Sequence, residues 1–453
     1  MIAILTGISL LIFLTMCALA VFKPHWAIVL IFSLFAYEQL LSSYITLLGQ
    51  KTWLLNVVVG VISMISLTML YVYGKRPFQN GLNPNSVLIA SLFVFAYFGY
   101  TYSRIPPAAL YFIKTGFPYA VLMLVILPSL VTSQEQIKKM CLPLLIIGCS
   151  LIALILISPR TQYYGMRLFI DLSYTHGGES RGNPLAIAEF GGLIVIVAAL
   201  MGRPNQGMMV RLIRIASIFL GLSICFLAAA RGQLIFAIFF SVLLYPVAYE
   251  IKNIGQFFIR ASSIGAVAGI MLVIAKMFLF KTDSSQRFGS SEISDGISGR
   301  MQMATTMIGE YLANPANYLQ GLGTGSYNAI VMSKGDNYLY PHNIVIEVLT
   351  HHGLIGFSIL MGIFGITGYH TIKLLRMMQE GLVDRGSVAI VIALSGYWTL
   401  ISLKQGSFLI IPVPFYMYLI TSKMYLRQRS EIGVHEYEEE DCYDYPGDQY
   451  DDS

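Results

Sequence analysis

The chain has 453 residues, of which 56% are hydrophobic and only 12% are charged. A soluble protein of this length usually carries about 25% charged residues, whereas one membrane span uses roughly 20 apolar residues, so the composition indicates an integral membrane protein. The net charge of +5 comes without a basic block that could neutralise a row of phosphates, which disfavours nucleic-acid binding.

Apolar runs of bilayer length recur along the whole chain. They lie near residues 2–22, 27–48, 53–73, 87–103, 109–131, 141–158, 185–201, 212–230, 232–250, 262–280, 353–372, 386–403 and 406–424. Their lengths predict an all-α fold, a polytopic helical bundle of about 12–13 transmembrane helices. The first run has no positive charge before it and is longer than the apolar region of a signal peptide, so we expect it to be a retained span.

Lysine and arginine gather on every second connection between these runs. Examples are Lys75 with Arg76, Lys138 with Lys139, and Lys423 with Arg427. Short basic connections of membrane proteins face the cytoplasm, so these connections and the C-terminus are predicted to be cytoplasmic. Thirteen spans would then place the N-terminus outside, and twelve would place it inside.

Two of the outer connections are long and polar. They cover residues 159–184 and residues 281–341, and the second lies between the tenth and eleventh predicted spans. Long connections of this kind commonly carry function. Within the second, residues 299–308 have the apolar spacing of a helix, and the sequence GLGTG at residues 321–325 predicts a turn.

The C-terminal segment differs from the rest of the chain. Residues 430–453 are acidic and rich in tyrosine, with too little apolar content to bury a core, so they are predicted to form a disordered cytoplasmic tail after a membrane domain of residues 1–429. The five cysteines have neither C-x-x-C nor mixed cysteine and histidine spacing, which disfavours disulfides and zinc.

The sequence PHNIVIEVLTHHGLIG at residues 341–356 contains the most informative histidine. Proline suits the first position of a helix, so His342 is expected in the first turn, on one helical face with Gly353 and Gly356. These glycines would let another helix pack closely, and the positive end of the helix dipole would keep the imidazole neutral and able to accept a proton. The alternative is a histidine that only caps an interfacial helix. Two later histidines of the motif are expected to be packing residues.

Three arginines are candidates for binding an anion. Arg231 interrupts the apolar stretch 215–249, so it marks either a tight outer turn or a break at membrane depth, where an arginine faces a cavity or an anion; the alternative is an arginine that extends to the interface at a hairpin tip. Arg300 and Arg181 are weaker candidates, since each alone is typical of a solvated loop. Together with His342, they suit a substrate with a pyrophosphate group and a reaction with one general base.

No cofactor is expected. Neither outer loop contains D-x-D, and no clustered carboxylates indicate a Mg²⁺ or Mn²⁺ site. The sequence therefore predicts metal-independent chemistry.

At these motifs the sequence resembles the O-antigen ligase and O-antigen polymerase superfamily of bacterial membrane glycosyltransferases. The resemblance lies in the order of Ala-Arg-Gly-Gln-Leu at Arg231, an arginine that opens an amphipathic segment at Arg300, the GLGTG turn, and His342-Asn343 nine residues before Gly353-Leu354-Ile355-Gly356. It covers about residues 181–370.

The resemblance implies a GT-C-like helical membrane fold in the bacterial inner membrane, with the loop 281–341 and the active site in the periplasm. By similarity, His342 would deprotonate an acceptor sugar hydroxyl, while Arg300 and Arg231 would hold the pyrophosphate of an undecaprenyl-pyrophosphate-linked glycan, with Arg181 as a helper. Asn343, Gly353 and Gly356 would support the site. The hydroxyl would attack the anomeric carbon with inversion.

Three functions remain open at this point. A surface-polysaccharide polymerase would transfer the chain onto another lipid-linked glycan and is the favoured interpretation; an O-antigen ligase would transfer it onto lipid A core. A secondary transporter or lipid flippase is the third, although such proteins tend to bind at broken helices near the bilayer midplane. Expected partners are the bilayer, a flippase and a chain-length regulator.

Overall fold

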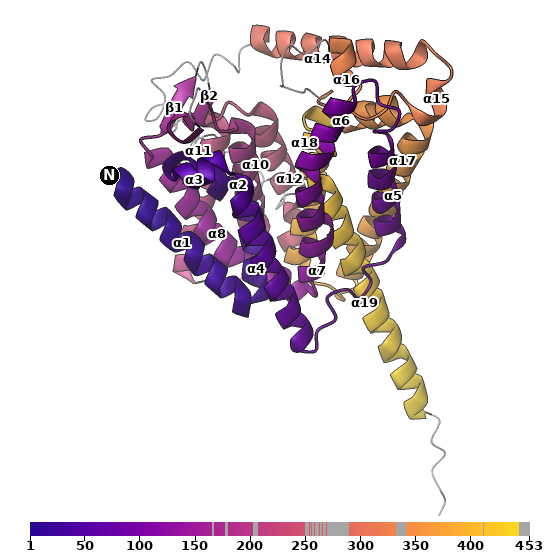
Figure 1. Ribbon diagram of the computed structural model, residues 1–453. Helices are drawn as coiled ribbons and strands as arrows, with labels where there is room; N and C mark the ends of the chain where they lie inside the picture. Colours follow the sequence, from indigo (N-terminus) through magenta and orange to yellow (C-terminus); the bar gives the residue numbers. More distant parts are fainter. Residues whose placement is uncertain are drawn as a thin grey trace, which may run out of the picture.

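Helices account for most of the chain (Figure 1). The structure is a computed structural model that describes residues 1–164, 167–176, 180–202, 207–249, 290–331, 341–410 and 412–443, together with single positions between 253 and 269. The first half contains α1 (Ile2–Phe22), α2 (Pro24–Tyr44), α3 (Thr46–Gln50), α4 (Trp53–Val72), α5 (Pro84–Phe98), α6 (Pro106–Ala120), the π-helix η1 (Val121–Ile126), α7 (Leu127–Leu130) and α8 (Gln134–Ile157). There follow β1 (Thr161–Tyr164), β2 (Arg167–Ile170), α9 (Ser173–His176), α10 (Pro184–Leu200), α11 (Met208–Leu227) and α12 (Arg231–Tyr249). The last part contains α14 (Ser290–Leu312), α15 (Asn317–Gln320), α16 (Tyr327–Val331), α17 (Ile344–Gln379), α18 (Arg385–Lys404) and α19 (Val413–Tyr443).

The predicted all-α polytopic membrane fold is confirmed. In the described ranges, nine helices are long and apolar enough to cross a membrane, and α5 and α10 are shorter apolar helices. The nine are α1, α2, α4, the continuous unit α6–η1–α7, α8, α11, α12, α17 and α18. The predicted span 262–280 lies outside the described residues, so the total of 12–13 stays a prediction. The last predicted span starts later than expected, because residues 405–410 form a connection and α19 begins at Val413.

Helix starts follow from local sequence. A proline opens α2, α5, α6 and α10, where its missing N–H would have no partner in any case. Asn83 caps α5 in a reciprocal arrangement with Ser86, and Asn183 caps α10 by accepting from the Leu185 amide at 3.0 Å. Side-chain caps of this kind satisfy amides that the first turn leaves open.

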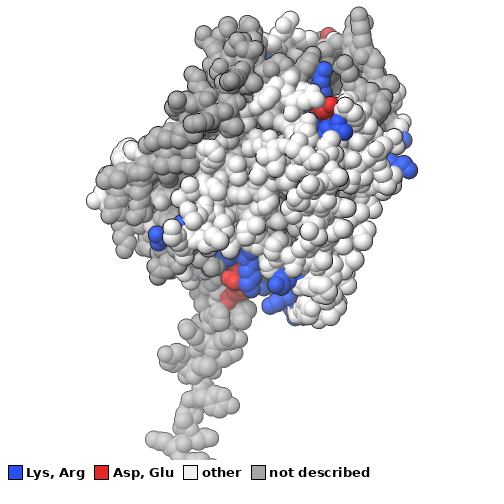
Figure 2. Space-filling model, turned by 90° about the vertical axis from the view of Figure 1, so that its left-hand side faces the viewer, with Lys and Arg blue, Asp and Glu red and all other residues white. Residues whose placement is uncertain are grey.

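The short elements of the two long connections gather at one end of the bundle. The antiparallel hairpin of β1 and β2, in which Thr161 pairs with Ile170, lies at the top of Figure 1 with α14, α15 and α16, whereas α19 extends from the opposite end. The described parts of both long connections therefore share one end. On the face in Figure 2, charged side chains gather near the two ends of the molecule, and a broad white band lies between them. This distribution fits a bundle with a hydrocarbon belt.

Helix α19 continues past the predicted domain boundary. An ion pair between Arg427 and Glu431, at 2.9 Å and four residues apart, lies across residue 429, and pairs at this spacing support a helix. The helix runs to Tyr443, so it does not end where the tail was predicted to begin. Residues 444–453 lie outside the described part, and the disorder of the tail stays a prediction.

Buried apolar side chains form two clusters in the described part of the chain. The larger one joins α1, α2, α4, η1, α7, α8, α10, α11, α12 and α18 with the last turns of α17 and one side of α19. The other joins α5, α6, the earlier part of α17, the connection between α18 and α19, and residues of α19. A lateral groove of about 1220 Å³, lined mainly by apolar side chains of α5, α6–α7 and α17, borders the second cluster. Residues of both clusters line one small cavity at the start of α17 and the end of α18.

Candidate active site at the start of helix α17

His342 lies immediately before α17. The Asn343 side chain caps this helix, because its Oδ1 accepts hydrogen bonds from the amides of Val345 at 3.0 Å and Ile346 at 3.1 Å. The helix therefore begins at Ile344, and His342 has a left-handed backbone with φ of 60°. The prediction that His342 stands in the first helical turn is wrong. The Asn343 cap sets the start of the helix, because asparagine is among the preferred capping residues, and a left-handed residue such as His342 cannot belong to the helix.

Asn343 also fixes the position of this turn in the bundle. Its Nδ2 donates to the backbone oxygen of Leu403, at 2.9 Å, near the end of α18. One asparagine thus joins the start of α17 to the end of α18. Because His342 directly precedes Asn343, its backbone lies at this junction.

The imidazole of His342 is kept neutral by its surroundings. Burial lowers the pKa of His342 below its ordinary 6.5, and the positive charge of Arg300 lowers it further. Burial penalises the charged form of a histidine, and a nearby cation repels the added proton. A neutral imidazole near pH 7 can accept a proton. The lowered pKa of His342 agrees with the neutral imidazole that the sequence predicts. The cause is burial and the charge of Arg300, rather than the dipole of a helix that contains His342.

Arg300 is presented by α14, which crosses the top of the bundle (Figure 1). Met307 and Tyr311 lie four residues apart and are buried, so this face of the helix packs downward. Arg104, between α5 and α6, pairs with Glu310 at 3.1 Å and ties the helix to the bundle. The helix predicted at residues 299–308 is confirmed, and its described packing fixes the segment that carries Arg300.

The GLGTG turn packs against a break in α17. Gly353 has φ of 61° and ψ of −162°, so it interrupts the helix. The amide of Leu322 donates to the Thr350 oxygen, and the amide of Gly323 donates to the His351 oxygen, each at 2.9 Å. The break thus exposes two carbonyls, and the turn satisfies them.

The predicted common face of His342, Gly353 and Gly356 is wrong for the same reason. His342 precedes the helix, and the left-handed Gly353 changes the direction of the chain before Gly356. A Cβ atom on Gly353 would overlap the backbone of Leu319, at the end of α15. Close packing at this glycine is therefore present, but its partner is α15 rather than a second span.

Arg231 lies at a tight turn, as one of the two sequence interpretations predicts. Helix α11 ends at Leu227 and α12 begins at Arg231, with only three alanines between them. Ala229 is left-handed, with φ of 49°, and the Ala230 amide donates to the Cys225 oxygen at 3.1 Å, which closes the turn. Arg231 is therefore the first residue of α12, directly after this turn.

Lys404, at the end of α18, lies beside this turn. A Cβ atom built on Gly232 would come within 2.5 Å of the Lys404 Nζ, so the lysine covers the residue next to Arg231. The same Nζ donates to the Oε1 of Gln233 at 3.3 Å. Since Leu403 receives the Asn343 hydrogen bond, the end of α18 connects the Arg231 turn to the His342 turn.

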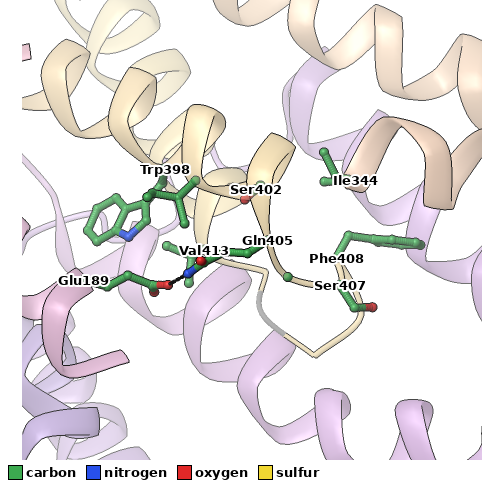
Figure 3. A pocket seen from close by; sticks show the side chains of 10 residues that line it. Glu189, Ile344, Trp398, Ser402, Gln405, Ser407, Phe408 and Val413 are labelled. Carbon is green, nitrogen blue, oxygen red and sulfur yellow. Dashed lines mark hydrogen bonds between the residues drawn. The ribbon is translucent and has the colours of Figure 1, made fainter. Parts of the chain in front are cut away.

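Two carboxyl groups hold the connection that follows Lys404, a half-buried one on Glu189 and a buried one on Glu347. Gln405 donates to Glu189 of α10 at 2.8 Å (Figure 3). Glu347 of α17 accepts from the Ser407 hydroxyl at 2.5 Å and from the Phe408 amide at 3.1 Å. Glu189, Gln405, Ser407 and Phe408 line a cavity of about 10 Å³, room for at most about one water molecule. The connection is therefore packed and fixed rather than solvated.

Arg181 belongs to a group of residues around the β-hairpin. It pairs in a β-bridge with Asp171, and its guanidinium lies 5.6 Å from the centre of the Phe169 ring. Burial raises the pKa of Asp171, but hydrogen bonds from Ser173 and the charges of Arg160 and Arg181 leave that pKa lower than usual. The described contacts place Arg181 in an ionic cluster at the same end of the bundle, and its role as a helper stays a prediction.

A family model described as O-antigen ligase matches residues 215–361. This segment contains Arg231, Arg300, His342 and the GLGTG turn. Over this segment the chain is similar to the O-antigen ligase family that the model describes. The match covers about a third of the chain. No curated protein matches the chain.

Sequence reasoning singled out Arg231, Arg300 and His342 in the matched segment, but it missed the residues that pack around the end of α18. Lys404, Gln405 and Glu189 all lie outside the matched residues. Lys404 carried one usable signal, because a lysine on a short outer connection is an exception to the excess of cations on the cytoplasmic side. Glu189 carried another, since it is a carboxylate within the apolar run 185–201, where charges are costly and commonly functional.

Proposed function

We propose that the chain is a surface-polysaccharide polymerase, a metal-independent inverting glycosyltransferase that acts on an undecaprenyl-pyrophosphate-linked glycan. The observation that carries the proposal is the electrostatic interaction between Arg300 and His342 at the junction of α17 and α18. It supports the pairing of a neutral base with a cation that can bind an anionic leaving group. The family match supports a reaction of the ligase or polymerase type.

In the proposed reaction His342 accepts the proton of an acceptor sugar hydroxyl. The hydroxyl oxygen attacks the anomeric carbon of the donor, and the bond from that carbon to the pyrophosphate oxygen breaks, with inversion. Arg300 and Arg231 stabilise the charge that develops on the departing undecaprenyl pyrophosphate, and Arg181 assists. One oriented donor is commonly worth about 3 kcal/mol in such a site, while a general base contributes about 10²- to 10⁴-fold in rate.

The proposed location is the periplasmic face of the bacterial inner membrane. The basic connections at the α19 end support a cytoplasmic assignment for that end, so the end with α14 and His342 would face the periplasm. The proposed partners are the lipid-linked donor, an acceptor glycan and the bilayer, with a flippase and a chain-length regulator in the same pathway.

An O-antigen ligase is the second candidate, because the matched family model carries that description. It would use the same residues and transfer the glycan onto lipid A core. Deleting the gene separates the two. Loss of a polymerase leaves surface lipopolysaccharide with at most one repeat, whereas loss of a ligase strands long chains on undecaprenyl pyrophosphate.

Two further outcomes would contradict the proposal. If the deletion strain holds the lipid-linked repeat on the cytoplasmic leaflet, the protein is a flippase rather than a transferase. Activity of the purified protein should persist in EDTA, and restoration of an EDTA-treated sample by Mg²⁺ or Mn²⁺ would contradict the metal-independent mechanism.

A further inference from the structure

The connection between α18 and α19 carries a cation that the proposed mechanism does not use. Lys404 ends α18, and its side chain is partly buried. It lies against Gly232, directly after Arg231, at the N-terminus of the 19-residue helix α12. Its Nζ donates to two neutral amide oxygens, on Gln233 at 3.3 Å and on Gln405 at 3.5 Å.

The position of Lys404 is fixed from both sides. On one side, the Leu403 oxygen accepts from the Asn343 side chain, so the preceding residue is bonded to the turn that holds His342. On the other side, Gln405 donates a hydrogen bond to the half-buried Glu189. An ammonium held in this way has lost the mobility of a surface lysine, and the entropic cost of ordering its stem has been met in the fold.

Charge at this place favours an anion. The N-terminus of α12 has the partial positive charge of its open amides, and both Arg231 and Lys404 lie at it. The Glu189 carboxyl group interacts electrostatically with Lys404, and it accepts a hydrogen bond from Gln405. A ligand with two phosphate groups would lie against cations from α12, α14 and α18.

Resting on the proposed function, we propose that Lys404 is a further binding residue for the pyrophosphate of the donor, and that Glu189 and Glu347 position its connection. Arginine grips phosphate oxygens bidentately, whereas lysine provides a compact charge. Lys404 would therefore add affinity for the second phosphate rather than set the geometry of bond breaking.

The test compares binding of undecaprenyl pyrophosphate and undecaprenyl monophosphate to the purified full-length protein in detergent. Lys404→Gln should weaken binding of the pyrophosphate about tenfold or more, and binding of the monophosphate much less. Lys404→Arg should recover most of the loss. Lys51→Gln is the matched control, because Lys51 is exposed and lies on another outer connection; it should bind both lipids as the wild type does.

Each result separates this inference from the proposed function. Equal pyrophosphate affinity of Lys404→Gln and wild type would overturn the role of Lys404 while leaving the transferase proposal in place. Failure of the wild type to bind the pyrophosphate would overturn both. If Lys404→Gln lowers the melting temperature, a second variant, Gly232→Ala, tests the proposal. It keeps the lysine but displaces the flexible end of its side chain, so it should also weaken pyrophosphate binding. Unchanged pyrophosphate binding in Gly232→Ala would refute the proposal.

Discussion

His342 combines a strained backbone with a controlled protonation state. A left-handed conformation in a residue other than glycine costs about 1–3 kcal/mol and persists only where the surroundings determine it. Here the Asn343 cap and its bond to Leu403 hold the turn. The backbone strain thus lies at the residue that we propose as the general base.

The first prediction concerns Arg300 and the pH dependence of transfer. The base form of His342 exists above its pKa, which burial and the charge of Arg300 lower from 6.5, so the acidic limb of the rate profile should lie below pH 6.5. Arg300→Gln removes a charge that disfavours the imidazolium. The pKa therefore rises, and the acidic limb should move to higher pH.

The measurement is kcat/KM for glycan transfer between about pH 5 and pH 8. Arg300→Lys keeps the positive charge and should leave the limb close to its wild-type position even where the rate falls. An acidic limb that stays in place in Arg300→Gln would show that Arg300 does not act on His342.

At the residue scale, the sequence reveals groups whose chemistry is unusual for their position. His342 and Arg231 stand out because a histidine follows a proline before an apolar run and an arginine interrupts one. Lys404 carried only the signal of an unusually placed charge, because its contact with Gly232, 172 residues earlier in the chain, forms only in the folded bundle. Long-range contacts of this kind leave no periodic signal.

Helix α17 is interrupted at the position where a turn from another part of the chain forms hydrogen bonds with its carbonyl groups. Apolar periodicity predicted its membrane-spanning part, but could not predict the break at Gly353, because the carbonyls released there are paired by the distant GLGTG turn. The same limit applies to the short hairpin of β1 and β2, whose strands are four residues each within a loop. Local patterns specify long helices better than they specify connections.

The second prediction tests this break. Gly353→Ala places a Cβ atom in a left-handed residue and against the Leu319 backbone, so it should destabilise the protein by about 1–3 kcal/mol or more and lower the melting temperature in detergent. Gly365→Ala is the matched control in the same helix, because its Cβ would meet nothing within 4 Å. Alanine is favoured over glycine in a helix by about 1 kcal/mol, so the control should be neutral or stabilising. Equal melting temperatures for the two variants would contradict the account of α17.

On the scale of the whole molecule, the fold separates two chemically different ends. The α14 end carries His342, Arg300 and the Arg231 turn, and the other end carries ion pairs such as Lys138 with Asp384 at 3.0 Å. Hydropathy predicted the spans and cation placement predicted their orientation, because both depend on the bilayer rather than on specific contacts. The meeting of two packed clusters at the site could not be predicted in this way.

The third prediction tests the orientation. The test uses a protein in which the native cysteines are replaced. Gln320→Cys, on the exposed α15, should react with a membrane-impermeant maleimide in intact spheroplasts. Lys139→Cys, on the exposed start of α8, should react only after the membrane is permeabilised. The reverse pattern would place His342 in the cytoplasm and contradict the periplasmic assignment.

The most direct test of the central claim is complementation of a deletion strain with His342→Ala at matched expression. Loss of a general base should reduce polymer by about 10²- to 10⁴-fold, while the lipid-linked repeat accumulates at the periplasmic face and the variant keeps its wild-type melting temperature. Wild-type amounts of polymer from the variant would contradict the assignment of His342 as the base.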